Sequence, residues 1–382
     1  MSVSSDNFYS STSQESSNGG QEALALYRTI LSRPGFVDWN QIVEKAKQER
    51  WANIIFNNGK LYSRYGWQMA SLPESFQPDA SSYEKALIST LPSERHLMEL
   101  MGASGATDFG VTIEGMRMRG NVYRELQGLS GVFRPISANV LSDAELMLDS
   151  KIIQLVTTTK QGFVLVTGPT GSGKSATVVA LLEKINEVCS YNVITIEDPI
   201  EYVFTPKRSI FSQREVGDHV ESFDSALRSA MRENPDVIFV GEIRDYPTLS
   251  TALKAAETGH LVFATLHTRR VYTTLNRLLQ LAPPGERDAI RDALAQNILM
   301  ILCQNLLQRR GGGLVPCREI AIRNNAVISC ISSGKVRDIN NVMISNRPFG
   351  MIDWNAALNL HMQSRLITEQ EANLYRDREV EV

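Results

Sequence analysis

The eight residues GPTGSGKS, from Gly168 to Ser175, constrain this chain more than any other segment. They match the pattern G-x-x-x-x-G-K-[S/T] of a phosphate-binding P-loop. Its glycines let the backbone turn tightly and point its N–H groups inward. Lys174 can then reach the β- and γ-phosphates of a nucleotide, and the hydroxyl of Ser175 can bind Mg²⁺.

The segments on either side of the loop favour the same interpretation. The apolar run Gly162–Thr167 predicts a short buried strand, and Ser175–Val188 predicts a helix whose N-terminus faces the phosphates. The alternative is a glycine-rich turn with only a structural role, and such a turn would need neither this strand nor this helix beside it. The predicted nucleotide-binding residues are Gly168, Pro169, Thr170, Gly171, Ser172, Gly173, Lys174, Ser175 and Ala176.

Composition narrows the class of protein. The chain has 382 residues, of which 43% are hydrophobic and 21% charged, enough for two domains of an ordinary globular protein. The net charge of −3 argues against direct binding to nucleic acid. We expect no signal peptide, because the first residues lack a basic region and an apolar core, and no apolar run in the sequence is long enough to span a membrane. The 4 cysteines are widely spaced, which argues against zinc and disulfides and favours the cytoplasm.

The predicted fold class is α/β, with an α+β domain ahead of the P-loop domain. A serine-rich, acidic start predicts a disordered lead-in. In the first domain we expect helices at Glu22–Ser32 and Trp39–Glu49, two strands joined by an Asn-Asn-Gly turn within Trp51–Met69, and a β-rich run at Thr107–Ile136. Ser142 or Asp143 could cap the helix after the linker. The predicted divisions are 1–20 lead-in, 21–137 N-terminal domain, 138–150 linker and 151–382 P-loop domain with a helical C-terminal part.

Strands and helices alternate from Gly162 onward. The strands GFVLVT, NVITIE, DVIFVGE and HLVFATLH alternate with helices, which predicts a parallel sheet covered on both faces. After Thr268 the pattern is mostly helical, with one strand in VPCREIAI. The helices expected in the whole segment are Ser175–Val188, Ser222–Arg232, Pro247–Thr258, Val271–Leu281, Pro284–Gln308, Ala326–Ser332, Lys335–Ile344, Asp353–Gln363 and Thr368–Arg376.

Two acidic groups end predicted strands, where the ligands of parallel sheets bind. Glu242 closes DVIFVGE, with Gly241 at the place of an ordinary Walker B aspartate. Glu197 lies in ITIEDPIEY, followed by Asp198 and Glu201. A P-loop enzyme needs such a carboxylate to organise Mg²⁺ and the attacking water. The simpler interpretation of any one acid is a solvated turn residue.

Histidines and arginines supply further candidates. His267 ends the fourth strand on the ligand side, whereas His260 precedes that strand; either could be purely structural. Arginines are dense before the P-loop and after the Glu197 segment. Most surface arginines are solvated, but ring ATPases use arginines outside the nucleotide core to reach a neighbour's phosphates. The candidates are Arg117, Arg119, Arg124, Arg134, Arg214, Arg228 and Arg232.

Taken together, these motifs resemble those of the PilT-like secretion and pilus traffic ATPases. GPTGSGKS resembles the Walker A motif of that family, ITIEDPIEY its Asp box, NPDVIFVGEIRD its Walker B and AAETGHLVFATLHT its His box. MRMRGNVY and VFRPI resemble its arginine-bearing N-terminal segment. The likeness covers about residues 105–375, with all motifs in order.

The resemblance implies a homo-hexameric ring in which a PAS-like domain packs on the RecA-like domain of the next subunit, with ATP and Mg²⁺ between them. By matching position, Lys174 and Ser175 bind phosphate and Mg²⁺. Glu197 would be the general base, Glu242 would hold Mg²⁺ and water, and His267 would sense the γ-phosphate. The charge-stabilising arginines, some acting in trans, would be Arg117, Arg119 and Arg214, with Arg134 near the nucleotide.

Departures from the family pattern affect the predicted task. The zinc-bearing insert of assembly members is absent, and the retraction signature AIRN should begin near Ala326, where AVIS stands. The letters AIRN at 321–324 are out of that register, Ala264 replaces a usual Gly, and Gly120 a usual Val. The chain looks most like the DotB/TraJ branch of type IVB secretion and plasmid conjugation.

The sequence therefore predicts a motor for conjugation or type IV secretion, which hydrolyses ATP. We expect it at the inner face of the bacterial inner membrane, held there by membrane components of the machine. The alternatives are a pilus retraction or assembly ATPase, a RecA-like DNA motor, and a nucleotide-gated scaffold without turnover.

Overall fold

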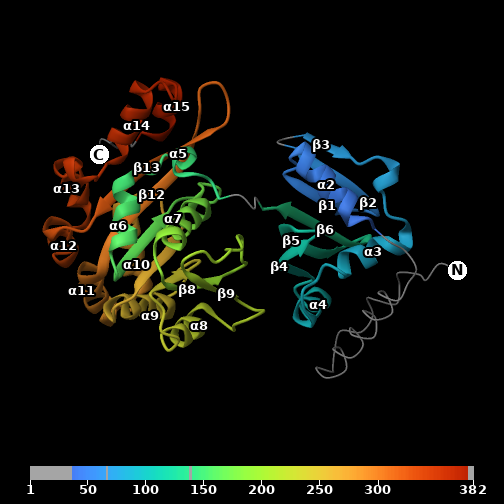
Figure 1. Cartoon of the computed structure of the whole chain (residues 1–382), viewed down its shortest axis with the longest axis horizontal. Coiled ribbons are helices and arrows are strands. Elements are labelled where there is room, and N and C mark those ends of the chain that lie inside the picture. The colour runs from blue at the N-terminus through green and yellow to red at the C-terminus, as the bar shows by residue number, and fades with distance from the viewer. Residues whose placement is uncertain (1–36, 66–67, 137–139, 377–382) are drawn as a thin grey trace. The chain divides into compact units, whose positions relative to one another are not determined.

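The structure is a computed structural model that describes residues 37–65, 68–136 and 140–376 (Figure 1). The predicted lead-in at 1–20 and the predicted helix Glu22–Ser32 lie outside the described residues. The chain divides into two compact units, Met1–Ala138 and Asn139–Val382. Within the described ranges, no helix combines the length and the apolar character needed to cross a membrane.

The N-terminal unit is built on a six-stranded sheet with the order β3-β2-β1-β6-β5-β4. Every neighbouring pair in it is antiparallel. The predicted Asn-Asn-Gly turn is confirmed between β1 and β2, where Asn58 and Gly59 have φ of 50° and 72°. The elements are α2 (Trp39–Glu49), β1 (Asn53–Asn57), β2 (Lys60–Tyr65), β3 (Gln68–Ser71), η2 (Glu74–Phe76), α3 (Ala80–Ile88), α4 (Glu94–Met101), β4 (Ala106–Ile113), β5 (Met116–Glu125) and β6 (Gly128–Pro135).

The two faces of this sheet differ. On β5, Met118, Gly120 and Val122 are buried in the core shared with α2, α3 and α4. Because side chains alternate along a strand, Arg117 and Arg119 belong to the opposite face. The N-terminal unit therefore has a helix-covered apolar face and a face that carries arginines.

The C-terminal unit is built on a seven-stranded sheet with the order β13-β12-β7-β11-β10-β8-β9. All pairs are parallel except β12 with β13. The four strands predicted before Thr268 are present, but β9 was not expected. The strands are β7 (Gly162–Thr167), β8 (Asn192–Glu197), β9 (Ile210–Glu215), β10 (Val237–Val240), β11 (Leu261–Leu266), β12 (Ile298–Gln308) and β13 (Leu314–Ile322).

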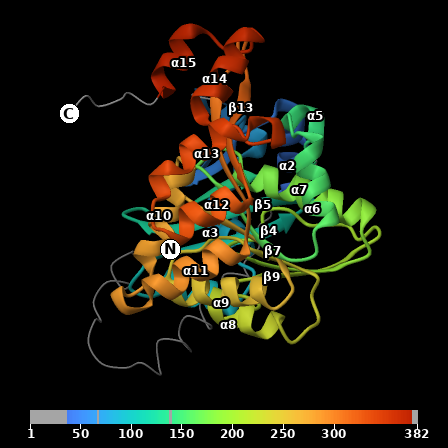
Figure 2. The ribbon, with the colours of Figure 1, turned by 90° about the vertical axis from the view of Figure 1, so that its left-hand side faces the viewer.

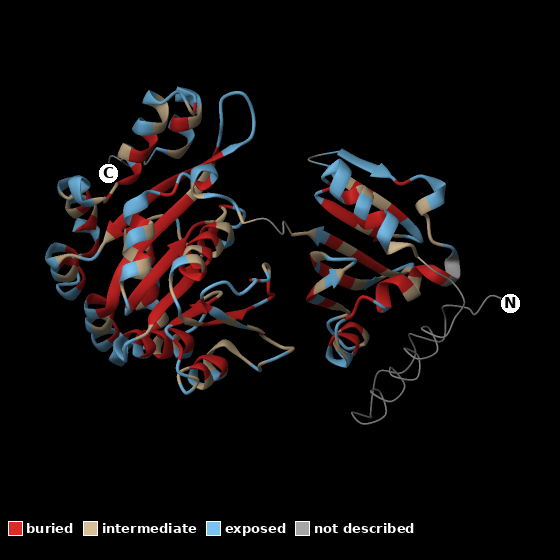
Figure 3. Ribbon diagram, in the orientation of Figure 1, coloured by how far each residue is buried: buried red, intermediate tan, exposed pale blue. Residues whose placement is uncertain are grey.

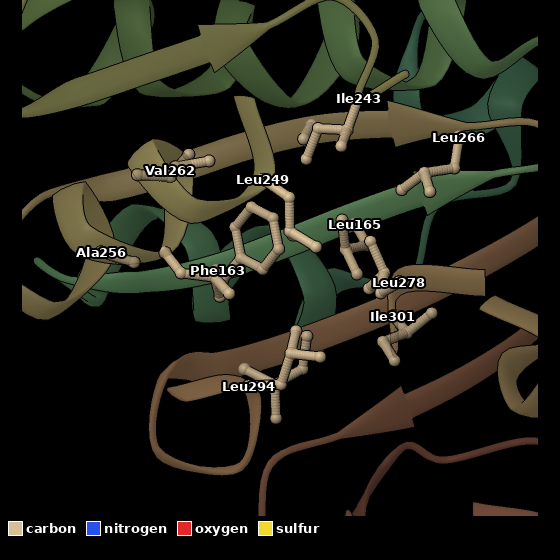
Figure 4. Close-up of a cluster of buried hydrophobic side chains, with 14 of the residues drawn as sticks. Phe163, Leu165, Ile243, Leu249, Ala256, Val262, Leu266, Leu278, Leu294 and Ile301 are labelled. Carbon is tan, nitrogen blue, oxygen red and sulfur yellow. The ribbon is translucent and has the colours of Figure 1, made fainter. Parts of the chain in front are cut away.

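Helices bury both faces of this sheet. Phe163 and Leu165 of β7 point into a cluster formed with α9, α10 and α11 (Figure 4), whereas Val164 and Val166 point into a second cluster with α6 and α7. Figure 2 shows α11, α12 and α13 gathered on one side of the sheet and α7 on the other, and the central strands are buried throughout (Figure 3). The helices are α5 (Asp143–Leu146), α6 (Ser150–Thr158), α7 (Lys174–Val188), α8 (Phe223–Ala230), α9 (Tyr246–Glu257), α10 (Val271–Leu281), η3 (Pro284–Glu286), α11 (Arg287–Asn297), α12 (Asn325–Ser332), η4 (Val336–Asp338), α13 (Ile339–Ser345), η5 (Arg347–Phe349), α14 (Trp354–Gln363) and α15 (Glu369–Tyr375).

The predicted long helix Pro284–Gln308 is wrong. The helix α11 ends at Asn297 and the chain continues as β12. Residues Ile298–Leu302 are all apolar, and such a run does not distinguish a buried strand from a buried helix. Pairing decides the outcome, because β12 inserts between β7 and β13 with both faces buried.

The first helix of the C-terminal unit begins where the sequence allows it. Ser142 is the N-cap of α5 and forms a capping box, in which it accepts from the backbone of Glu145 while the Glu145 side chain accepts from Ser142. Of the two caps that the sequence allowed, Ser142 or Asp143, the structure shows Ser142.

Gly120 is a glycine by necessity of packing. It stands opposite both Phe109 and Phe133 on the neighbouring strands, and an added Cβ would lie 2.7 Å from the Phe109 ring. We expect Gly120→Val to lower the free energy of unfolding by about 1–3 kcal/mol, because the side chain would overpack this core. Urea unfolding of the full chain measures the change.

The matched control is Gly285→Ala, where nothing lies within 4 Å of the added atom. Gly120→Val should cost less stability in a Phe109→Ala chain than in the parent, since that chain lacks the clashing ring. Equal stability of Gly120→Val and the parent would contradict the packing explanation.

Candidate active site

The P-loop joins the end of β7 to the start of α7 at Lys174. Gly168, Gly171 and Gly173 have φ of 155°, 77° and 82°, in the region that favours glycine. A Cβ on Gly168 would lie 2.2 Å from the carbonyl oxygen of Gln304, whereas at Gly171 nothing lies within 4 Å. The loop is therefore pressed against β12 on one side and open on the other.

The P-loop lysine is folded into its own loop. The Lys174 Nζ donates to the carbonyl oxygens of Gly168 at 2.8 Å and Pro169 at 3.1 Å. Burial lowers the pKa of Lys174 from its ordinary value. Ser172 Oγ is buried without a hydrogen-bond partner in the described part of the chain, while Ser175 is exposed in the first turn of α7. A loop of this kind fits an anionic ligand.

Side chains that follow neighbouring strands form one polar network. His267, directly after β11, lies with Nδ1 3.3 Å from Lys174 Nζ and Nε2 3.5 Å from Glu242 Oε1. Arg244 Nε donates to Glu242 Oε2 at 2.9 Å, and its Nη1 donates to Asp198 Oδ2 at 3.1 Å. The structure thus joins the P-loop lysine to the acid after β10 and to the Asp198 segment.

Gly241 and Glu242 directly follow β10, and the glycine at this place has a steric cause. The Gly241 N–H donates to the Ile196 carbonyl at 2.7 Å, and a Cβ on Gly241 would lie 3.1 Å from that oxygen and 3.3 Å from the Glu197 Cα. Any side chain at this position would press on β8. The carboxylate therefore comes one residue later than in an ordinary Walker B strand.

Glu197, the last residue of β8, occupies a different environment. It is only 7% exposed, and its Oε1 accepts from Thr195 Oγ1 at 2.6 Å and from Gln213 Nε2 at 3.4 Å. Desolvation by burial, opposed by these two donors, raises the pKa of Glu197 to about 7. A carboxylate with this pKa can exchange a proton near neutral pH.

The candidate arginines fall in both units. Arg214 lies on β9 and pairs with Glu233. Arg119 and Arg134 stand directly opposite each other on β5 and β6, and Arg117 lies two residues before Arg119 on the same strand. Like charges facing each other across strands destabilise a sheet, and here Asp108 lies 4.0 Å from Arg119.

Several residues of the site were not singled out from the sequence. Arg244 lies in the predicted Walker B motif, and its position two residues after Glu242 was a usable indication. Thr195 and Gln213 hold Glu197, but Gln213 lies on β9, which was not predicted. Gln304 was assigned to a helix and instead lies beneath the P-loop on β12.

Comparisons with known proteins match these features. A family model described as Type II/IV secretion system protein matches residues 139–365. A twitching motility protein of Neisseria gonorrhoeae is 40% identical over 297 residues, which are 77% of this chain and 79% of that protein. The type IV pilus retraction ATPase PilT of Pseudomonas aeruginosa is 39% identical over 267 residues, which are 70% of this chain and 77% of that protein.

Solved structures of secretion and pilus ATPases also match this chain. The crystal structure of the pilus retraction motor PilT with bound ADP matches with a TM-score of 0.81 and 36% identity, over 90% of this chain and 98% of that one. The ATPase DotB of Legionella pneumophila matches with a TM-score of 0.78 over 90% of this chain and 96% of that one, but its 24% identity shows only the shared fold. The chain belongs to the type II/IV secretion system protein family and is an ATPase of that family.

The raised pKa of Glu197 predicts a pH-dependent effect on stability. The folded chain binds a proton at Glu197 with a pKa of about 7, against 4.5 for the ordinary carboxyl, so this group makes the parent less stable as pH rises from 4.5 to 7. Glu197→Gln removes the ionisation. We expect the stability of the variant relative to the parent to increase by about 3 kcal/mol between pH 4.5 and pH 8 in urea unfolding without nucleotide.

Glu187→Gln is the control of opposite sign. Hydrogen bonds from Lys207 and Lys184 hold the pKa of Glu187 below its ordinary value, so this variant should lose stability relative to the parent at neutral pH and regain it in acid. A pH-independent difference between Glu197→Gln and the parent would show that the Glu197 carboxyl titrates normally.

Proposed function

We propose that this chain hydrolyses ATP as the motor of a type IV pilus machine, with pilus retraction as its task. The observation that carries the proposal is the continuous network from Lys174 through His267 to Glu242, with buried Glu197 at the same edge of the sheet. Such an edge, built on a P-loop, supplies a phosphate cradle, a metal-holding acid and a base.

The loop residues fit a nucleotide. The N–H groups of Gly168–Ala176, except at Pro169, which has none, and the ammonium of Lys174 would hold the phosphates. The open space at Gly171 leaves the loop accessible. The Ser175 hydroxyl and the Glu242 carboxylate would hold Mg²⁺, which neutralises phosphate charge when bound. His267, 45% exposed, can donate an N–H toward the γ-phosphate.

The two acids have different tasks in this proposal. Glu197, with its pKa of about 7, accepts the proton of the attacking water as general base. Glu242 is 23% exposed and paired with Arg244, and it would serve as the metal-holding acid of the site. The different surroundings of the two acids assign the two roles.

The arginine-bearing face of the N-terminal unit supports a site shared between subunits. Arg119 and Arg134 face each other across adjacent strands, and an anion would relieve their repulsion. The phosphates of a nucleotide on a neighbouring copy are such an anion, which Arg117 could also reach. We therefore propose a homo-hexamer with a PAS-like N-terminal domain and a RecA-like C-terminal domain, in which Arg214 stabilises charge in cis. The ring would work against inner-membrane components, without direct nucleic acid binding.

The comparisons favour retraction over the conjugation or type IVB secretion role that the sequence motifs put first. The relatives named for twitching and retraction are 40% and 39% identical, whereas DotB shares the fold at 24%. One observation keeps conjugation or secretion as a second candidate. The retraction signature AIRN is expected to begin near Ala326, but α12 carries AVIS at 326–329. The letters AIRN instead lie at 321–324, where they end β13 and supply Asn324 as the N-cap of α12.

Glu242→Gln separates binding from hydrolysis. The amide keeps the size of the side chain but removes the charge that would hold Mg²⁺ and orient water, so kcat should fall at least about a hundredfold while ATP binding persists. Phosphate release and a fluorescent ATP analogue measure the two properties. Lys174→Ala should lose both, and Glu257→Gln, exposed on α9, should lose neither. Unchanged turnover in Glu242→Gln would assign the essential acid elsewhere.

The cellular task is tested by replacing the gene with its Glu242→Gln form and scoring three phenotypes side by side. Retraction predicts loss of twitching with pili still present, while plasmid transfer and effector secretion remain. Loss of transfer or secretion with normal twitching would establish the second candidate instead.

A further inference from the structure

A single buried amide holds the P-loop from beneath. Gln304 of β12 is 2% exposed, and its Nε2 donates to the carbonyl oxygen of Ser172 at 2.7 Å. Its Oε1 accepts from Thr177 Oγ1, one turn into α7, at 2.9 Å. The same side chain thus joins the loop to the helix that follows it.

A buried arginine stands directly opposite this amide. Arg318 of β13 pairs with Gln304 across the ladder, and its Nε donates to Gln304 Oε1 at 2.7 Å. Its Nη1 donates to the carbonyl of Met147, the C-cap of α5, at 3.1 Å. The side-chain oxygen of Gln304, Oε1, therefore accepts from two donors. This turns the amide N–H₂ toward Ser172 and fixes the orientation of the amide.

Stability alone does not account for this arginine. Arg318 is 7% exposed, its Nη2 has no hydrogen-bond partner, and no carboxylate in the described ranges pairs with it. Burial lowers its pKa to about 10. A buried cation without a counter-ion is costly, and apolar residues of similar volume are commonly at least as stable. Because the buried Arg318 costs stability and yet donates to the Gln304 amide, we infer that the orientation of this amide matters for function.

We propose that Gln304 is a positioning residue for ATP hydrolysis, which sets the conformation of the P-loop through Ser172, and that Arg318 fixes the orientation of its amide. Both act through the loop. The proposal rests on the function proposed above, because that function supplies ATP as the nucleotide that the P-loop binds. The pair also ties the loop to Met147, near the beginning of the C-terminal unit.

Gln304→Glu tests the contact with Ser172 selectively. The carboxylate still accepts from Thr177 and Arg318, but it cannot donate to the Ser172 carbonyl. We expect kcat/KM for ATP to fall about tenfold, chiefly through KM, because the cradle loses its fixed shape. Arg318→Met should act in the same direction, and Arg318→Lys, which keeps a donor, should recover part of the activity. Gln308→Glu, exposed on the same strand, is the matched control.

Amide hydrogen exchange on the full chain without nucleotide gives a readout that does not require turnover. Peptides covering 168–177 should exchange at least about fivefold faster in Gln304→Glu and Arg318→Met than in Gln308→Glu, with other peptides unchanged. If the parent fails to hydrolyse ATP, the proposed function fails, while this local exchange still decides the positioning role. Unchanged exchange at the loop, or equally faster exchange throughout the chain, would overturn it.

Discussion

The parallel register of β7, β11, β10 and β8 is the constraint on which the rest of the site depends. Thr167 pairs with Leu266, Val240 with Ala264, and Ile196 with Val240, so these strands end close to one edge. The residues that follow are the P-loop, His267, Glu242 and Glu197. Because side chains alternate along a strand, a slip of one residue would turn these groups to the other face.

The same sheet gives two carboxylates opposite electrostatic surroundings. Glu197 ends a buried strand and accepts hydrogen bonds from neutral donors, so its charge is poorly solvated. Glu242 lies two residues beyond the end of its strand and contacts Arg244 and His267. The close approach of Gly241 to β8 produces this difference, since it moves the second acid outward. The close contact between two strands thereby places the two carboxylates in different surroundings.

The sequence correctly predicted those strands, turns and helix caps that a few neighbouring residues are enough to determine. The strands around Phe163 and Val262, the turn at Asn58 and the cap at Ser142 all carry their own chemistry in the sequence. The elements that were missed depend on distant partners. β12 is an apolar run that becomes a strand because β7 and β13 offer it hydrogen bonds, and β9 is a half-exposed edge strand without a strong pattern.

The sequence by itself determined the P-loop, the acids and histidine at the strand ends, and the family, because these features are written as contiguous motifs. Only the tertiary structure decided which of them meet: Lys174 with His267, His267 with Glu242, and the P-loop with Gln304 and Arg318. It also decided that Glu197 is buried and titrates near neutrality. Most of these contacts join segments that lie far apart in the sequence, up to 132 residues for Ser172 and Gln304, and no local pattern encodes their distance.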